Sequence, residues 1–529
     1  MIDLLIKNGL IVDGTGNKPF SADVGIRNGK ISQIGRISEP AKTVIDASGY
    51  VVAPGFIDIH SHSDLCPFIL GRNAQSKLFQ GITLEIVGNC GISCLPVDDV
   101  SRARLTSFFG TALQLPLNGK ELADDSLSDY EKHLVQESPY NNMGFLVGHG
   151  TLRGCVIGLD MKKASPDELV RMAELLDRQL EQGAFGMSLG LIYPPSSYGD
   201  VDEFIALAKV LKKHEALLTV HMRSESTKIF EAVDEMLQVA EATGVHLELS
   251  HLKLIGKPQW GRAGELLDKI KSARERGLNI TCDQYPYTAT STGLSALVPK
   301  WAHDGGPEKM CERLLQPTEK LLREMEEELD RRGGAENVLV VGAHGTHREF
   351  EGKRLNFIAE KLGLKPSLAA AKLLIDAGGG VDCCYFSLSE NDVLKIMQEK
   401  FIVVGSDGYA YTYDKSYLGT NPHPRNFGTF PRFFQTVREH NLMSLEDAVA
   451  KATGTTAAIL GLKDRGVLKE GFCADITVFD SAAIEDRSTY VDSLEKPKGI
   501  KAVIVGGKVA LLDGRAAEAR QGVLVRHEG

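Results

Sequence analysis

The sequence predicts an α/β protein built on a (β/α)8 TIM-like barrel, with a small β-sandwich domain made from both termini and a helical insertion. Three observations support this prediction. Short apolar runs alternate with helix-length amphipathic stretches through the middle of the chain. The two ends carry similar hairpin patterns. One late interval is oversized, helical in pattern and rich in charge.

The two ends of the chain resemble each other in pattern. Residues 3–13 and residues 500–513 each show an alternating apolar strand, a turn that contains glycine and a second strand. We expect strands from both ends to form one sandwich of residues 1–53 and 461–529, because each half has an apolar face that needs a partner. The alternative is two unrelated β decorations.

The middle of the chain, residues 54–460, is predicted to be the barrel. Helical stretches such as residues 165–182 separate the candidate strands. The charge-rich interval predicts an inserted helical subdomain at about 294–335, which could be a lid or a solvated decoration. The run at 337–345 also looks like a strand, so the numbering of the late strands stays open. The eight candidate strands are FIDIHSH, ITLEIVGN, MGFLVGHG, AFGMSLGL, LLTVHMR, HLELSHLK, NITCDQYPY and FIVVGSDG.

Composition excludes several classes of protein. The chain has 529 residues, of which 43% are hydrophobic and 25% charged, as in ordinary globular proteins. A formal net charge of −10 argues against a nucleic-acid partner, which would need a basic surface. No apolar run is long enough to span a membrane, and no signal peptide is evident. Nine scattered cysteines cannot all pair, which favours a reduced, cytoplasmic chain.

Histidines follow three of the candidate strands. His60 and His62 stand two residues apart, and alternate residues of a strand point to the same side, so both rings can reach one cation. His221 and His251 end two further apolar runs. A single histidine at a strand end is usually structural. Four of them at the mouth of one barrel, where catalytic groups gather, favour a metal site.

Asp407 and Cys90 extend this set. Asp407 lies at the tip of the last strand, where a carboxylate could bind metal and accept a proton from the attacking water. An Asp before Gly408 is also a common turn residue. Cys90 follows the second strand between glycines, and its thiolate would suit zinc better than a hard cation. The alternative for Cys90 is a buried cysteine without a role.

Taken together, these residues resemble the amidohydrolase superfamily and, within it, the D-aminoacylase (N-acyl-D-amino-acid deacylase) family. The resemblance covers nearly the whole chain. Many members of the superfamily bridge two metals with a carbamylated lysine on the fourth strand, whereas AFGMSLGL contains no lysine. The motifs that carry the resemblance are PGFIDIHSHSD, GNCGIS, GHGTLR, GAFGMSLGLIYPP, DQYPYTATST, VGSDG and HPRNFGTFPR.

The resemblance implies a zinc enzyme with one tight metal site and a second, weaker site. The tight site would use Cys90, His221 and His251. The second would use His60, His62 and Asp407, with Cys90 between the two metals. Asp407 would also carry the proton from the attacking water to the leaving nitrogen.

The resemblance also implies which residues hold the small-molecule substrate. Lys253, Tyr285 and Arg425 match the positions that bind the α-carboxylate of the amino acid, and Ser291 matches a further polar position of the pocket. A guanidinium, an ammonium and a phenol hydroxyl are all suitable partners for a carboxylate. Residues 98–130 do not align with the family pattern and are expected to shape the side-chain pocket.

The predicted function is zinc-dependent hydrolysis of the amide bond of N-acyl-D-amino acids, giving a carboxylate and a free D-amino acid. One alternative is a cyclic-amide hydrolase like the hydantoinases and dihydroorotases. Another is a non-catalytic assembly protein on the same fold, although such proteins typically lose metal ligands. The acyl group, the side chain, the number of metals and the oligomeric state stay open.

Overall fold

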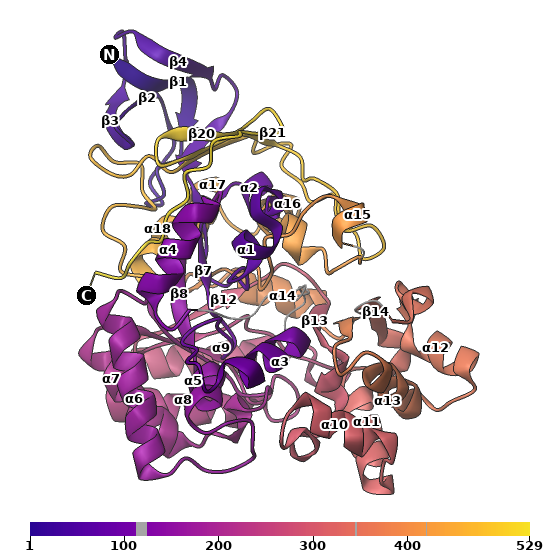
Figure 1. Ribbon diagram of the computed structural model, residues 1–529. Helices are drawn as coiled ribbons and strands as arrows, with labels where there is room; N and C mark the ends of the chain where they lie inside the picture. The colour runs from indigo at the N-terminus through magenta and orange to yellow at the C-terminus, as the bar shows by residue number, and fades with distance from the viewer. Residues whose placement is uncertain (113–123, 344–345, 419, 529) are drawn as a thin grey trace.

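The computed structural model describes the whole chain apart from residues 113–123, 344–345, 419 and 529 (Figure 1). In this view the strands of the N-terminus lie at the top, the barrel below them, and a separate helical lobe at the lower right. Within the described part of the chain, no helix is long and apolar enough to cross a lipid bilayer.

Eight parallel strands form the barrel, and each corresponds to one of the eight runs predicted from the sequence, so the predicted fold class is confirmed. The barrel closes between its first and last strands, where Ser61 bridges Gly408 and the amide of Asp407 donates to the carbonyl of His60 at 2.8 Å. In sheet order the strands are β6 (Phe56–Asp58), β7 (Ile82–Val87), β8 (Asn142–Gly148), β9 (Gly186–Gly190), β10 (Leu217–His221), β11 (His246–Leu249), β12 (Ile280–Gln284) and β17 (Ile402–Val404).

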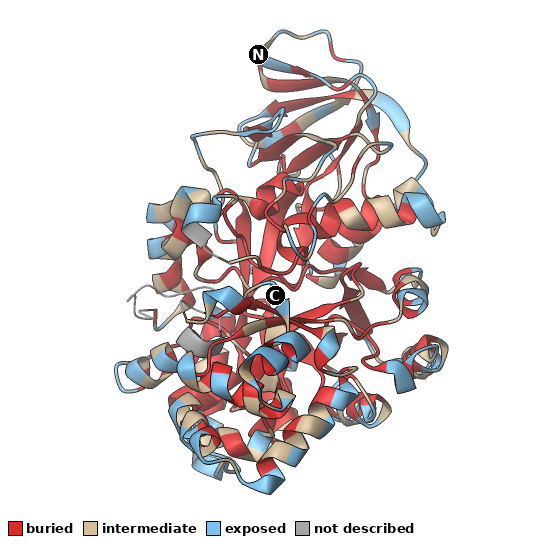
Figure 2. Cartoon of the chain, turned by 90° about the vertical axis from the view of Figure 1, so that its right-hand side faces the viewer, coloured by how far each residue is buried: buried red, intermediate tan, exposed pale blue. Residues whose placement is uncertain are grey.

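Amphipathic helices cover the barrel because each has one apolar face to bury. In α6 (Pro166–Glu181), Ser165 and Glu168 form a capping box at the N-terminus. The same helix buries Met172 and Leu176. Figure 2 shows the result, with buried residues through the centre and exposed ones on the outer faces of the helices. The next helices around the barrel are α7 (Val201–Lys213), α8 (Ile229–Thr243) and α9 (Ala263–Glu275).

Strands from both ends of the chain join in one nine-stranded sheet, as the similar hairpin patterns predicted. β18 lies antiparallel to β5, and this pairing connects the C-terminal strands to the N-terminal ones. The limits at 1–53 and 461–529 stay a prediction. The strands are β1 (Ile2–Ile11), β2 (Phe20–Arg27), β3 (Lys30–Gly35), β4 (Ala41–Asp46), β5 (Val51–Pro54), β18 (Ile476–Phe479), β19 (Ile500–Val505), β20 (Lys508–Leu512) and β21 (Arg515–Ala516).

The insertion is larger than the helical stretch expected at about 294–335. It also contains a four-stranded antiparallel sheet and a hydrophobic core of its own. The strand-like run at 337–345 contributes β14 to this sheet and not to the barrel. The difference arises because β13 pairs with β16, almost a hundred residues later, which local patterns do not reveal. Its elements are β13 (Thr290–Gly293), α10 (Pro307–Leu315), α11 (Glu319–Arg331), β14 (Val338–Gly342), β15 (Lys353–Arg354), α12 (Leu355–Leu362), α13 (Pro366–Asp376) and β16 (Asp382–Tyr385).

Phe56, at the start of β6, connects the barrel to the terminal sheet. Its side chain is fully buried, and its ring lies 5.0 Å from Phe434, 5.6 Å from Phe479 and 5.7 Å from Phe430. Two of these partners belong to α16 (Arg425–His440), the helix that begins at a predicted substrate-binding residue. Packing of this kind makes the position of α16 depend on the barrel core.

We expect Phe56→Ala to lower the free energy of unfolding by about 3–5 kcal/mol, because it removes a buried ring and leaves a cavity. Chemical denaturation monitored by tryptophan fluorescence and circular dichroism would measure the change. Phe20→Ala is the matched control, since that ring is 45% exposed and should contribute little. Equal stability of the two variants would contradict the role assigned to the Phe56 cluster.

Candidate metal centre and active site

The predicted metal ligands come together at the carboxyl ends of the barrel strands. Ligand atoms of His60, Cys90, His251 and Asp407 all lie within 4.8 Å of one another. A second group on the same scale contains His221, His251 and Glu225. His62 lies beside the first group, with its Nε2 3.0 Å from Asp407 Oδ1. The structure therefore places all six predicted ligands in one buried cluster.

Cys90 lies at the centre of this cluster. Its Sγ is 3.3 Å from His60 Nε2 and 3.6 Å from His251 Nε2. Its backbone has φ 53°, a left-handed conformation that costs energy for a non-glycine residue. The next amide, of Gly91, donates to Ser188 Oγ at 2.9 Å, which helps to hold this turn. The backbone thus directs the thiol toward the histidines.

The histidines determine the ionisation of this thiol. Burial raises the pKa of Cys90, but the nearby His60 and His251 outweigh burial and hold that pKa well below its ordinary value. The lowered pKa favours the thiolate, which is the form of cysteine that binds zinc. A thiolate among imidazoles and a carboxylate is a suitable set of donors for a borderline-soft cation.

Two acidic residues orient the histidine rings. Asp283 Oδ2 lies 3.0 Å from His60 Nδ1, and its Oδ1 accepts from the backbone amide of His251 at 3.0 Å. Glu225 Oε1 lies 3.1 Å from His251 Nδ1. These contacts occupy the outer ring nitrogens and leave the Nε2 atoms facing Cys90.

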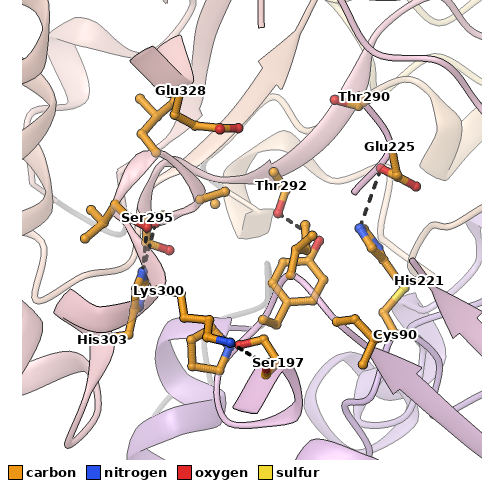
Figure 3. A pocket seen from close by; sticks show the side chains of 18 of the residues that line it. Cys90, Ser197, His221, Glu225, Thr290, Thr292, Ser295, Lys300, His303 and Glu328 are labelled. Carbon is orange, nitrogen blue, oxygen red and sulfur yellow. Dashed lines mark hydrogen bonds and ion pairs between the residues drawn. The ribbon is translucent and has the colours of Figure 1, made fainter. Parts of the chain in front are cut away.

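The remaining imidazole nitrogens are suited to binding a cation. His251 Nε2 lies only 2.9 Å from His221 Nδ1, so two ring nitrogens face each other in the cluster. The other nitrogen of His221, Nε2, lies 3.6 Å from Glu225 Oε2, beyond hydrogen-bond distance, as Figure 3 shows. Two ring nitrogens that face each other, with a carboxylate beside them, are suited to binding a metal ion.

Asp407 lies between the guanidinium of Arg425 and the histidines. Its Oδ2 accepts from Arg425 Nη1 at 2.6 Å, and its Oδ1 faces His62. Burial raises the pKa of Asp407, but Arg425 and His251 outweigh it and keep that pKa well below the ordinary value. For His62, burial lowers the pKa, but the hydrogen bond to Asp407 outweighs burial and raises that pKa to about 9. Asp407 is therefore a carboxylate that can bind metal or accept a proton.

The four predicted substrate-binding residues line one cavity of about 700 Å³ beside the cluster. Within the described structure, the hydroxyl of Tyr285 and Nε of Arg425 are buried without a hydrogen-bond partner. Lys253 is already engaged, because its Nζ lies 2.5 Å from Glu225 Oε1 and 2.7 Å from His251 Nδ1. Ser291 lies in β13 on the same wall, and its carbonyl accepts from Arg425 Nη2 at 3.3 Å. Residues that carry donors suited to a carboxylate thus line the cavity.

The insertion forms a second wall of this cavity. Figure 3 shows Ser295 and Lys300 on the side of the cavity opposite Cys90 and His221, whereas Thr290 lies near Glu225. Of the unaligned segment 98–130, Phe108 in α3 (Arg102–Ala112) lines the cavity, while residues 113–123 lie outside the described part of the chain.

Sequence reasoning missed three residues of the site. Glu225 follows His221 by four residues, and this spacing to a histidine is the only local signal. Asp283 lies in β12 two residues before Tyr285, and this position does not reveal its contacts with two histidines. Tyr193, in the loop after β9, has its ring 5.0 Å from the ring of His221. None of these contacts is local in the sequence except that of Glu225.

Comparison with known proteins agrees with this geometry. The profile described as the amidohydrolase family matches residues 141–510. The chain belongs to the amidohydrolase family. A second profile, the N-terminal domain of the urease alpha-subunit, matches residues 1–55 of this amidohydrolase, which contain β1 to β5.

Several relatives resemble this amidohydrolase along almost its full length. An N-acyl-D-glutamate deacylase of Alcaligenes xylosoxydans xylosoxydans is 35% identical, over 96% of this chain and 93% of the relative. A D-aminoacylase of the same organism is 32% identical over the same shares. The solved structure of N-acyl-D-glutamate deacylase from Bordetella bronchiseptica, complexed with zinc and a phosphonate inhibitor, superposes with a TM-score of 0.82 at 32% identity, covering 99% of each chain.

The ionisation of Cys90 leads to a test in chelator-treated protein. We expect iodoacetamide at about pH 6.5 to alkylate Cys90 first, because a thiolate persists there while an ordinary thiol is largely protonated. The reactivity should fall only as the pH drops through the lowered pKa. Peptide mapping would identify the modified residue. Cys94 is the internal control, because burial raises its pKa well above the ordinary value; faster labelling of Cys94 would contradict this assignment.

Proposed function

We propose that this amidohydrolase catalyses the zinc-dependent hydrolysis of the amide bond of N-acyl-D-amino acids, releasing a carboxylic acid and a free D-amino acid. The observation that supports it best is the joining of a metal-ligand cluster to unpartnered carboxylate-binding atoms in one cavity. The relatives named as deacylases point in the same direction.

Cys90, His221 and His251 would hold the tighter zinc ion. His60, His62 and Asp407 would provide a second, weaker position, with the thiolate of Cys90 between the two. Zinc, when bound, lowers the pKa of a water molecule and polarises a carbonyl group, which makes amide hydrolysis feasible at neutral pH. The donor set and the facing ring nitrogens of His221 and His251 support this assignment.

Asp407 would move the proton. As a buried carboxylate next to the metal cluster, it can accept a proton from the attacking water and deliver it to the leaving nitrogen, which is otherwise too basic to depart. Arg425 donates to Asp407 Oδ2, so a substrate carboxylate that binds Arg425 competes for the same guanidinium. Substrate binding would then loosen the pair and free an oxygen of Asp407 for proton transfer.

Tyr285, Arg425 and Lys253 would bind the α-carboxylate, with Ser291 as a further polar contact. Among the described residues, the buried Tyr285 hydroxyl and Arg425 Nε have no hydrogen-bond partner, and a carboxylate would satisfy both. Binding at this non-reacting group would place the scissile amide next to the metal cluster and so assist the reaction by positioning.

The alternatives lack a supporting observation in the structure. The fourth barrel strand, β9, carries no lysine that could be carbamylated, unlike the pattern of the hydantoinases and dihydroorotases. A non-catalytic assembly protein would not need all six predicted ligands, and the cluster contains all of them.

An activity screen tests the proposal. The zinc-loaded protein should release free amine from N-acetyl-D-amino acids at a far higher rate than from the L-enantiomers. A chelator should abolish the reaction, and added zinc should restore it. A simple hydantoin serves as the competing substrate, because its ring opening releases no free amine. Release of amine from none of the D-substrates would refute the proposal.

Tyr285→Phe gives the sharpest test of the α-carboxylate site. The change removes one hydroxyl for which the described part of the chain offers no hydrogen-bond partner, whereas replacing Arg425 would also disturb Asp407. A hydrogen bond to a charged group contributes about 1.5–3 kcal/mol, so kcat/KM for an N-acetyl-D-amino acid should fall about 10- to 100-fold.

The matched control uses the N-acetyl-D-amino-acid amide, which has no carboxylate. Its slow hydrolysis should be nearly the same in both proteins. If the variant loses activity equally on acid and amide, Tyr285 acts on the reaction itself and not on the carboxylate.

A further inference from the structure

One arc of the cavity wall is apolar. Among the described residues between 91 and 197, those that line the cavity include no charged side chain. The charged residues of the cavity come from the other barrel strands and from the insertion. A stretch of pocket without charge suits an apolar part of a ligand. Ile92, Phe108, Leu159 and Ile192 form this apolar wall.

Side chains of the apolar wall are packed on one side and open to the cavity on the other. Ile92 and Leu159 are half-buried against the main hydrophobic core and also line the cavity. Ile192 is half-buried as well, and Phe108 is 9% exposed. Apolar surface in contact with water is unfavourable, so an apolar ligand group that covers these side chains gains free energy.

The apolar wall begins next to the metal cluster. Ile92 follows Cys90 by two residues, so the two residues lie at most about 7 Å apart along the chain. The amide of Leu191, the residue before Ile192, donates to the carbonyl of His221 at 2.9 Å. A carbonyl group placed at the metal cluster would therefore have the apolar wall within reach of the chain attached to it.

Phe108 is held in the wall by the attachment of α3 to α5 (His149–Val156). Arg104 Nε, on α3, donates to the carbonyl of Gly154 at 2.7 Å. The two helices pack closely because Gly154 has no side chain, and a Cβ atom there would lie 2.5 Å from Leu105 Cδ2. The helix α3 also contacts α10 of the insertion, and Figure 1 shows the two side by side.

The insertion meets the far end of the wall at Leu159. The amide of Gly305 donates to the carbonyl of Leu159 at 3.4 Å. Gly306 allows this approach, because a Cβ atom there would lie 2.9 Å from Leu159 Cδ1. The whole cavity, at about 700 Å³, is in the size range of pockets that hold drug-sized ligands. An N-acetyl-amino acid is smaller than such ligands and would leave the wall uncovered.

The apolar wall lies across the barrel mouth from the proposed α-carboxylate site. Its residues follow the second, third and fourth strands of the barrel, whereas Lys253, Tyr285 and Arg425 follow the sixth, seventh and eighth. These are opposite arcs of a closed eight-stranded barrel. In an N-acyl-amino acid, the acyl chain and the carbon that carries the α-carboxylate are attached to opposite ends of the amide. With the carboxylate held on one arc and the amide at the metal cluster, the acyl chain extends toward the other arc.

We propose that Ile92, Phe108, Leu159 and Ile192 form a subsite for the acyl group, so that the preferred substrates carry an unbranched apolar acyl chain longer than acetyl, such as hexanoyl or octanoyl. This inference rests on the proposed deacylase function and names the acyl group of its substrate. An apolar side chain on the amino acid would branch from the carbon next to the carboxylate, on the opposite side of the metal cluster from this wall.

The test measures kcat/KM over two series of substrates. The first contains the N-acetyl, N-butanoyl, N-hexanoyl and N-octanoyl derivatives of D-alanine. We expect kcat/KM to rise about threefold to fourfold for each methylene group that the wall covers. The second series keeps the N-acetyl group and lengthens an unbranched alkyl side chain through D-2-aminobutyrate, D-norvaline and D-norleucine. We expect a smaller rise per methylene group in this series.

Variants locate the preference for long acyl chains. Leu159→Ala and Phe108→Ala should each lower the ratio of kcat/KM for N-octanoyl-D-alanine to that for N-acetyl-D-alanine, by about tenfold, because several apolar contacts are lost. Ile157→Ala is the matched control for Leu159→Ala and should leave the ratio unchanged. Within the described structure, Ile157 is half-buried on the same core two residues away but does not line the cavity. If Phe108→Ala fails to fold, the half-buried Leu159 still provides the test.

The outcomes separate this subsite from the proposed function. Hydrolysis of D-substrates without a rise along the acyl series overturns the subsite and leaves the proposed function intact. A steeper rise along the side-chain series also overturns it, since the wall would then bind the side chain. The same holds if the ratio persists in Leu159→Ala or falls equally in Ile157→Ala. If no N-acyl-D-amino acid of either series is hydrolysed, the proposed function fails and this inference fails with it.

Discussion

The buried thiolate of Cys90 is the interaction on which the rest of the site depends. A negative sulfur atom stands within 3.6 Å of two imidazole nitrogens, in a place from which solvent is almost excluded. Such a charge is stable only with opposite charges close by. The histidines supply that compensation in the free protein, and a cation would supply it more fully. The strained backbone at Cys90 is thus retained because it aims the sulfur at this position.

A second layer of buried charge keeps the loops of the cluster in place. Lys77 is fully buried, with its Nζ 2.5 Å from Asp58 Oδ2 and 2.6 Å from Ser406 Oγ. Asp58 also accepts from the amide of Ser406 at 2.9 Å. Asp58 precedes His60, and Ser406 precedes Asp407. Lys77 and Asp58 therefore connect the first barrel strand to Ser406, which follows the last strand, just below His60 and Asp407. Several hydrogen bonds offset the cost of burying this ion pair.

The two walls of the cavity carry different kinds of residues. The barrel side carries the proposed metal ligands, Asp407 among them, at or just after the ends of strands of the eight-stranded sheet. The insertion side carries Ser291, Thr292 and Lys300, which are attached to a separate sheet and core. A site arranged in this way can keep its chemistry while the insertion changes what it recognises. The deacylase relatives named for different substrates agree with such a division.

The sequence alone determined the barrel, the terminal sheet and most of the cluster. Strand periodicity and the spacing of His60 and His62 are local properties, and the carboxyl ends of barrel strands always meet at one mouth, so these predictions needed no knowledge of distant contacts. Tertiary structure alone decided the extent of the insertion, because the pairing of β13 with β16 joins segments far apart in the chain. It also decided that Arg425 pairs with Asp407 and that Lys300 meets the Ser197 carbonyl. The physical reason is the same in each case: a side chain's partner across a cavity depends on how whole elements pack, and no local pattern in the chain records that packing.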